Sequence, residues 1–155
     1  MGLEFQYMTK IEPAEISCPG CHTKQTVMLY ESLNVSVNPE AKKDLIDGKI
    51  HLFICNNCNA EIVIEKDLLY HDMSQHFIAY FIPRKSVFND DYIKNQITPG
   101  GQLDYKVPDF IKDNPEFEYF KNFHIVLSMD ELIRYVIFRD RIAQVNSRPE
   151  ESESP

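Results

Sequence analysis

The chain carries four cysteines, and they stand in two Cys-X-X-Cys pairs that are far apart in the sequence. Cys18 and Cys21 form the first pair, and Cys55 and Cys58 form the second. One such pair can direct two thiolates at a single cation, and two pairs complete the tetrahedral sulfur set of a structural zinc site. The spacing therefore predicts a closed metal site that uses every cysteine in the chain.

Haem attachment, disulfides and a redox pair are the alternatives to a metal site for these cysteines. Cys-Pro-Gly-Cys is followed by His22, which is also the pattern for covalent attachment of haem. Haem attachment would leave Cys55 and Cys58 without a role, and it requires export, for which no signal is visible. Disulfides or a redox pair are further alternatives, but stable disulfides are rare in the cytosol. Zinc is the expected metal, with iron as its rival, because spacing alone does not separate the two.

The residues beside the cysteines favour tight turns. Pro19 fixes φ within the first turn, and Gly20 places no side chain there. His22 and Asn59 each follow the second cysteine of a pair, where the backbone is commonly left-handed, and both residue types tolerate positive φ. His22 is thus predicted to be a turn residue and not a haem ligand.

Composition and charge restrict the classes of partner. A chain of 155 residues is long enough for one domain with a hydrophobic core. Its 24 acidic and 16 basic residues give a net charge of −8, which disfavours general attraction to nucleic acid or anionic lipid. The N-terminus lacks the apolar segment of a signal peptide, and no run approaches the roughly 18 apolar residues of a membrane span. We therefore expect a cytoplasmic protein with no membrane contact.

Residue patterns predict an α+β fold: an antiparallel zinc-ribbon sheet with an inserted short helix, an irregular aromatic-rich insert and a C-terminal helix. Strands are expected at 11–17, 24–37, 50–55, 60–70, 75–82 and 123–127, with a turn at 71–74. Helices are expected after an Asn38 cap and before Gly48, at 90–96, and at 129–145 behind a Ser128–Glu131 capping box. The last helix should bury a stripe of Leu132, Ile133, Val136, Ile137 and Ala143.

These elements suggest a single domain over residues 11–146. It divides into the ribbon and sheet (11–83), the insert (84–121), and the last strand and helix (122–146). Residues 1–10 are interpreted as a leader, in which Gly2 to Tyr7 could be an addition to a native chain that opens at Met8. Residues 147–155 are acidic and rich in serine and proline, which predicts a mobile tail.

The best enzymatic candidate is the group His71, Asp72 and His76, with His51 and His124 as neighbours. These side chains could hold a second, open metal ion, or supply a general base oriented by a carboxylate. The alternative is that His71 and Asp72 cap a β-turn, with Asp72 accepting hydrogen bonds from backbone amides. The turn is the favoured interpretation, so the prediction leans against an enzyme. An acidic stretch is explained equally well as a solvated loop: Asp104, Asp109, Asp113 and Glu116.

Two kinds of macromolecular partner come into question. A closed metal site on an acidic chain favours a module that binds another protein or regulates it. Nucleic-acid binding is the alternative, and it would use a local basic patch drawn from Arg84, Lys85, Arg134 and Arg141. The sequence identifies neither the partner nor the oligomeric state.

The order of motifs resembles the CpXC domain family. The resemblance is carried by Cys-Pro-Gly-Cys and then by segments at 34–39, 45–48, 53–58, 69–72 and 131–138. Leu69-Tyr70-His71-Asp72 is the most specific of these, and the likeness spans roughly Ile16 to Val145. It implies a prokaryotic protein whose four cysteines bind zinc, and it supplies no activity or substrate. The chain departs from the family pattern at His22, where glycine is usual, and in the long insert after Pro83.

Overall fold

The computed structural model describes residues 9–147, which form two β-sheets and a set of mostly short helices. The main sheet has the order β1-β2-β5-β6-β7, made of Lys10–Ser17, Lys24–Asn34, Leu68–Asp72, Phe77–Phe81 and His124–Val126. The second sheet is the hairpin of β3 (Leu52–Ile54) and β4 (Glu61–Val63). The helices are α2 (Pro39–Ile46), α3 (Arg84–Val87), α4 (Asp90–Gln96), α5 (Asp109–Lys112), the 3₁₀ helix η1 (Pro115–Lys121) and α6 (Met129–Asn146). The predicted α+β class is confirmed.

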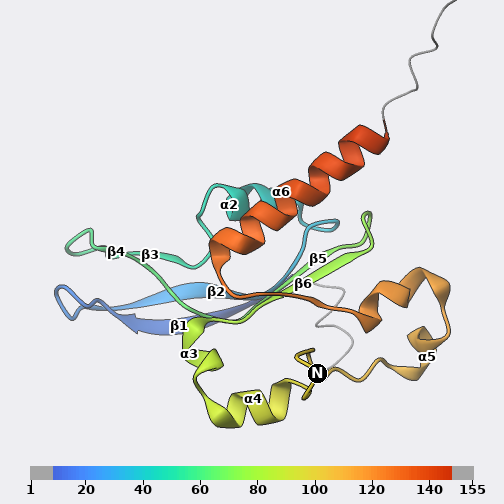
Figure 1. The fold of residues 1–155 in the computed structure, drawn as a ribbon. Helices are drawn as coiled ribbons and strands as arrows, with labels where there is room; N and C mark the ends of the chain where they lie inside the picture. The colour runs from blue at the N-terminus through green and yellow to red at the C-terminus, as the bar shows by residue number, and fades with distance from the viewer. Residues whose placement is uncertain (1–8, 148–155) are drawn as a thin grey trace, which may run out of the picture.

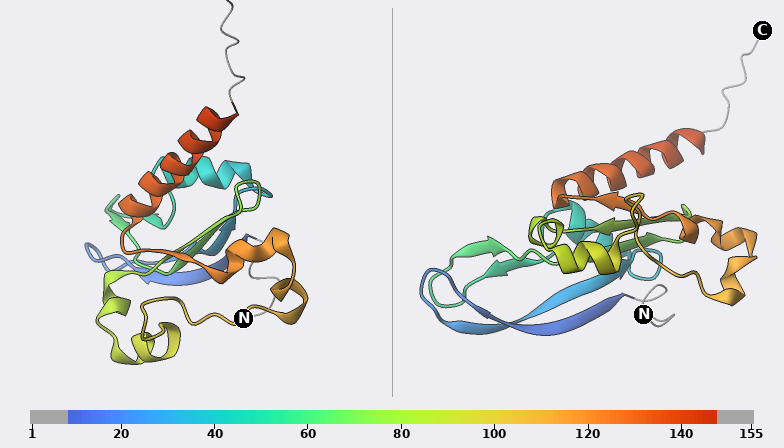
Figure 2. Two further views of the ribbon diagram at one scale, coloured as in Figure 1. Left: turned by 45° about the vertical axis from the view of Figure 1, so that its right-hand side comes forward. Right: turned by 60° about the horizontal axis from the view of Figure 1, so that its bottom comes forward.

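The main sheet lies between two layers (Figures 1 and 2). Helices α2 and α6 cover one face, and the insert that contains α3, α4, α5 and η1 lies on the other side. The α2/α6 side holds the largest hydrophobic cluster, with Leu33, Tyr70 and Leu132 among its fully buried members. Phe120 of η1 packs on Leu69 and Ile78 from the other side. All five residues of β5 are buried because both of its faces are covered.

The main sheet is mixed, so the expected antiparallel sheet is wrong in part. β1 with β2, β5 with β6, and β3 with β4 are antiparallel, but β2 with β5 and β6 with β7 are parallel. A parallel pair requires a crossover connection between its strands. Here α2 with the β3–β4 hairpin connects β2 to β5, and the insert connects β6 to β7. Strand signals in the sequence carry no information about these long-range connections.

Two of the predicted strands also have different bounds. The strand expected at 60–70 is two strands, β4 in the small hairpin and β5 in the main sheet, with residues 64–67 between them. The turn expected at 71–74 begins later, because His71 and Asp72 pair with Ile78 and Phe77 as the last residues of β5. The strand expected at 24–37 ends at Asn34.

Helix ends follow the predicted signals except at α2. The Ser128 hydroxyl accepts a hydrogen bond from the Glu131 amide, as the predicted capping box requires. The Glu131 carboxylate accepts its bond from the amide of Leu127, one residue before the cap. The predicted helix at 90–96 is α4. Gly48 ends α2 with φ of +74°, a left-handed value that favours glycine. Asn38, however, makes no side-chain capping bond to α2.

The predicted buried stripe of α6 is correct only in the first half of the helix. Leu132 and Val136 are buried and Ile133 is partly buried, but Ile137 and Ala143 are exposed. Ala143 is exposed because the C-terminal part of α6 extends past the sheet and α2 (Figures 1 and 2). Ile137 precedes the partly buried Arg139 and Asp140, so it is exposed because it lies off the buried face of the helix.

Two expectations about the chain ends lie mostly outside the described residues, namely the leader at 1–8 and the tail at 148–155. The first described strand begins at Lys10, inside the stretch interpreted as a leader. No helix between residues 9 and 147 has the length and hydrophobicity of a membrane span.

Candidate metal centre

Each Cys-X-X-Cys pair is the turn of a β-hairpin, and the two turns have the same backbone pattern. In the first, the Cys18 amide donates to the Thr23 carbonyl and the His22 amide donates to the Cys18 carbonyl, at 3.0 and 2.9 Å. In the second, Cys55 bonds to Ala60 and Asn59 to Cys55 in the same way, at 2.9 and 3.0 Å. The shared pattern shows that each turn positions its two sulfurs through its own backbone.

The left-handed positions in these turns are those that the sequence predicts. His22 has φ of 62° and Asn59 has φ of 59°. His22 thereby completes the first turn, as expected of a turn residue. At Gly20, an added Cβ would meet the Cys58 and Cys18 sulfurs at 3.7 and 3.8 Å, which is ordinary van der Waals contact. A side chain as small as alanine would therefore fit at this position.

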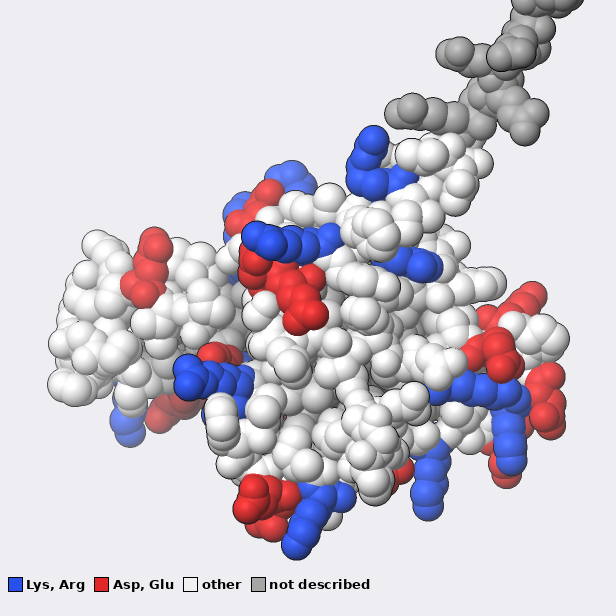
Figure 3. Space-filling view, in the orientation of Figure 1, with Lys and Arg blue, Asp and Glu red and all other residues white. Residues whose placement is uncertain are grey.

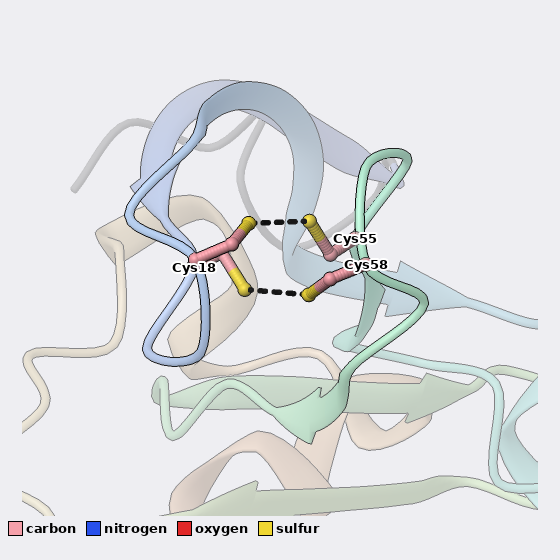
Figure 4. Close-up of side chains that lie close together, drawn as sticks. Cys18, Cys55 and Cys58 are labelled. Carbon is pink, nitrogen blue, oxygen red and sulfur yellow. Dashed lines mark hydrogen bonds between the residues drawn. The ribbon is translucent and has the colours of Figure 1, made fainter.

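The two turns face each other and gather four sulfur atoms (Figure 4). Cys18 Sγ lies 3.5 Å from Cys58 Sγ, Cys21 Sγ lies 3.6 Å from Cys55 Sγ, and all four fall within 4.8 Å of one another. Sulfurs bound to one zinc ion at about 2.3 Å would be separated by about 3.8 Å in a tetrahedron. All four cysteines are free thiols. The donor set and its spacing therefore fit one tetrahedral metal ion.

Hydrogen bonds at the centre lower the pKa of two of the four cysteines, Cys18 and Cys21, and so favour their thiolate forms. The Cys21 and Gly20 amides point at the Cys18 sulfur and lower the pKa of Cys18. The side chains of Asn57 and Thr23 lower the pKa of Cys21 to about 5. The Ala60 amide favours the thiolate of Cys58 too, but the neighbouring sulfurs of Cys18 and Cys21 outweigh it and raise the pKa of Cys58 to about 12. Four negative sulfurs repel one another, and a bound cation compensates that charge.

A small core supports the two hairpins behind the sulfurs. Cys18, Cys55 and Phe53 are fully buried and pack with Ile16 and Ile62. Gln25 connects the hairpins through its side chain, donating to the Ile54 carbonyl at 3.2 Å and accepting from the Asn56 amide at 3.0 Å. This role of Gln25 could not be predicted from the sequence, because nothing in a strand pattern marks which polar side chain reaches a distant turn. Asn57 and Thr23, which act on Cys21, were missed for the same reason.

His71 and Asp72 point to opposite sides of the main sheet, as neighbours on a strand do. Asp72 lies on the α2/α6 side, where Lys42 Nζ is 3.7 Å from its carboxylate. His71 faces the insert, where its Nε2 lies 2.7 Å from the Tyr119 hydroxyl. His76 is exposed and stacks on Tyr119 with the ring centroids 5.1 Å apart. The structure thus brings His71 and His76 to one tyrosine, with Asp72 on the other face.

Asp72 stabilises the β5–β6 turn through hydrogen bonds. Its Oδ1 accepts from the Ser74 hydroxyl at 2.6 Å, the Gln75 amide at 3.2 Å and the Ser36 hydroxyl at 3.4 Å. The Ser36 hydroxyl in turn accepts from the Met73 amide at 2.9 Å. These contacts agree with the turn-capping interpretation. Within residues 9–147, the only group of three or more potential metal ligands that converge is the cysteine set.

His51 and His124 lie apart from that group. His124, on β7, stacks on Tyr135 of α6 with the ring centroids 3.8 Å apart. His51 is buried beside β2, with its Nε2 2.9 Å from the Tyr30 carbonyl, and its backbone is left-handed with φ of 59°. Burial lowers the pKa of His51 below its usual 6.5.

The His51 environment predicts a pH dependence of stability. The unfolded chain takes up a proton at the His51 imidazole near pH 6.5, whereas the folded chain takes it up only at lower pH. The contribution of His51 to the free energy of unfolding is therefore complete above pH 6.5 and declines as pH falls toward the folded pKa. Urea unfolding between pH 5 and 7.5 should show a shallower pH slope for His51→Asn, which tolerates the same backbone. His76→Asn, at an exposed imidazole, should keep the wild-type slope; an unchanged slope in His51→Asn would contradict the account.

The candidate basic residues do not form one patch. Arg84 and Lys85 belong to α3, while Arg134 and Arg141 belong to α6 on the other side of the sheet. Arg134 is paired with Asp130 at 3.0 Å. Figure 3 shows basic and acidic side chains interspersed over the face that it presents. The acidic candidates are exposed on the insert, namely Asp104, Asp109, Asp113 and Glu116.

Three clefts on the described surface have linings that contain neither the cysteines nor His71, Asp72 or His76. One, of about 610 Å³, lies between β2, the β4–β5 link and α3, and is lined by Glu31, Lys66, Asp67, Tyr80 and Lys85 among others. Asp67 accepts hydrogen bonds there from the hydroxyls of Tyr80 and Tyr92, at 3.0 and 2.6 Å. The other two clefts lie along α6.

Comparison with known proteins gives one match. A search of curated proteins finds no similar protein, and a search of solved structures finds no similar fold. The sequence model of the family described as CpXC protein matches residues 16–145, which include both cysteine pairs, the main sheet from β2 to β7, the insert and nearly all of α6. The resemblance drawn from the motifs is thereby confirmed: the chain belongs to the CpXC family.

Proposed function

We propose that the chain binds one zinc ion through Cys18, Cys21, Cys55 and Cys58, and that the ion holds the two hairpins together. The observation that carries this proposal is the convergence of four sulfurs from turns that are far apart in sequence, with Sγ–Sγ separations of 3.5 and 3.6 Å across the two turns. Four protein ligands fill a tetrahedral site, so no position remains for water or substrate. The site is therefore structural.

The metal-bound hairpins act as a protein-binding module in the cytoplasm. The β3–β4 hairpin has an inner face with Phe53 and Ile62 and an outer face with Ile54 and Val63. Ile54 and Val63 are 46% and 56% exposed and lie diagonally across the strand pair, and the exposed Glu61 is directly opposite Ile54. The acidic net charge of −8 suits a partner with a basic surface around an apolar contact.

A binding experiment on this outer face tests the module. The wild-type chain and an Ile54→Glu/Val63→Glu variant are immobilised side by side and exposed to extract from the native host. The variant alters only the outer face, so its metal content and unfolding temperature should match those of the wild type. A partner retained by the wild type and lost from the variant supports the proposal. Identical captured proteins on both, or none on either, count against it.

The two other functions each have a direct test. Nucleic-acid binding predicts retention of DNA or RNA at low salt that falls steeply as salt rises. Catalysis near His71 predicts an activity that His71→Ala abolishes while the fold is kept, or a second metal ion per chain. The interspersed charges and the turn contacts of Asp72 favour the protein-binding module over both.

A further inference from the structure

The C-terminal half of α6 is an amphipathic segment whose apolar side faces no other part of the described chain. The helix contacts the sheet through its first turns, and every residue from Arg141 to Ser147 is exposed. Figures 1 and 2 show this half extending away from the sheet, at the opposite end of the molecule from the cysteine turns. Phe138, Ile142 and Val145 are 54%, 37% and 53% exposed.

The exposed side of α6 is a continuous stripe of residues that are three and four positions apart. Glu131, Arg134, Phe138, Arg141 and Val145 recur at intervals of three and four residues, so they lie along one face of the helix. Ile142 lies beside this row, and Leu127, just before the helix, is 56% exposed. Such a three-and-four spacing is the one by which helices pair side by side.

Two clefts lie end to end along this stripe and share Phe138. The first, of about 430 Å³, is lined by Ser128, Asp130, Glu131, Arg134, Tyr135 and Phe138. The second, of about 370 Å³, is lined by Phe138, Arg141, Ile142, Val145 and Asn146. The first cleft therefore carries two carboxylates, whereas the second carries an arginine and most of the exposed apolar side chains.

We infer that this stripe is an interface between two copies of the chain, with their α6 helices packed antiparallel. An antiparallel arrangement brings the second cleft of each copy against the first cleft of the other. Arg141 of one copy then lies beside Asp130 and Glu131 of the other, while Val145 lies near Leu127 and Phe138 lies near Arg134 of the opposing copy. The stripe is self-complementary in charge, which a two-fold interface requires.

The charges within the stripe balance when two copies meet. In one copy, Asp130 is paired with Arg134 at 3.0 Å, and Arg141 donates to the Gln144 side chain at 2.7 Å. When two copies pair, Arg141 exchanges the Gln144 side chain for the carboxylates of the other copy. The interface then contains two acidic and two basic residues from each copy. This local balance offsets the repulsion between two chains that each carry −8.

The contact is restricted to one helix from each copy, so it is small and the dimer is reversible. The inference goes beyond the proposed function, because it assigns a second copy of the chain to a surface that is separate from the hairpin module. It does not depend on the metal, since α6 and the cysteine turns lie at opposite ends.

Sedimentation velocity over about 1 to 200 μM chain tests the inference. The wild type should change from monomer to dimer across this range, and Phe138→Glu should stay monomeric throughout. Phe88→Glu is the matched control, since Phe88 is 75% exposed on the insert, and it should dimerise as the wild type does. A wild type that is monomeric at 200 μM, or a Phe138→Glu chain that still dimerises, would overturn the inference.

A charge-reversal pair tests the antiparallel arrangement itself. Arg141→Glu and Asp130→Arg should each weaken self-association at least tenfold, and an equimolar mixture of the two should recover dimers. A mixture that fails to recover them contradicts the antiparallel contact. Zinc content is measured for every chain: unchanged zinc with no dimer rejects only this inference, whereas absent zinc with an intact dimer rejects only the metal site.

Discussion

Cys55→Ser is expected to abolish metal binding and to lower the stability of the whole ribbon. Cys55 is fully buried, and its sulfur lies 3.6 Å from that of Cys21 across the two turns. Zinc binding by four thiolates provides about 10–16 kcal/mol in zinc-finger peptides, which is comparable with the net stability of a domain. The variant should therefore retain less than about a tenth of the wild-type metal after dialysis. Its unfolding temperature should fall by about 10 °C or more.

The matched control is His22→Asn, which changes a neighbour of the cysteines while keeping a residue type that tolerates positive φ. This chain should hold the wild-type amount of metal and unfold near the wild-type temperature. Full metal content and an unchanged unfolding temperature in Cys55→Ser would contradict a structural role for the site.

Loss of the metal should loosen the ribbon before the main sheet. The cluster around Cys18, Phe53 and Cys55 is separate from the cluster that α2 and α6 form on the main sheet. Amides in β3 and β4 should therefore gain hydrogen-exchange rate in the metal-free chain, while those in β5 and β6 stay protected.

Asp72→Ala is expected to destabilise the fold by about 3 kcal/mol, which is large for a single change outside the metal site. The carboxylate is only 5% exposed and accepts three hydrogen bonds, with Lys42 close by. Its removal leaves the partly buried Gln75 and the exposed Ser74 without that acceptor, and it takes one of two carboxylates away from Lys42. Urea unfolding measures the loss directly.

Asp104→Ala makes the same chemical change at an exposed residue and should cost less than about 0.5 kcal/mol. Asp72→Asn keeps the shape and one acceptor oxygen, so its loss should lie between the two. Equal stability of Asp72→Ala and the wild type would contradict the turn-capping role.

Local features of this molecule could be predicted from sequence because neighbouring residues decide them. The left-handed backbones of His22 and Asn59, the α6 capping box and the bounds of α4 each depend on a few adjacent residues. The convergence of the four sulfurs was also predictable, because each Cys-X-X-Cys turn constrains its own pair.

Long-range features could not be predicted in the same way. The parallel pairs β2–β5 and β6–β7 depend on crossovers through α2 and through the insert, which strand propensity does not encode. Residues 64–67 look strand-like in sequence but connect two different sheets. Ala143 follows the helical period of α6, yet it is exposed because the helix extends past the sheet. The position of Asp72 on the opposite face from His71 likewise depends on where β5 ends.

X-ray absorption of the purified chain tests the central claim most directly, since one spectrum identifies the metal and its ligand atoms. The account predicts a zinc edge, one ion per chain, and a first shell of four sulfurs at about 2.3 Å. An iron edge would show that iron, and not zinc, is the metal bound by the four cysteines. A first shell containing nitrogen or oxygen, or a folded chain with no bound metal, would contradict the closed four-cysteine site.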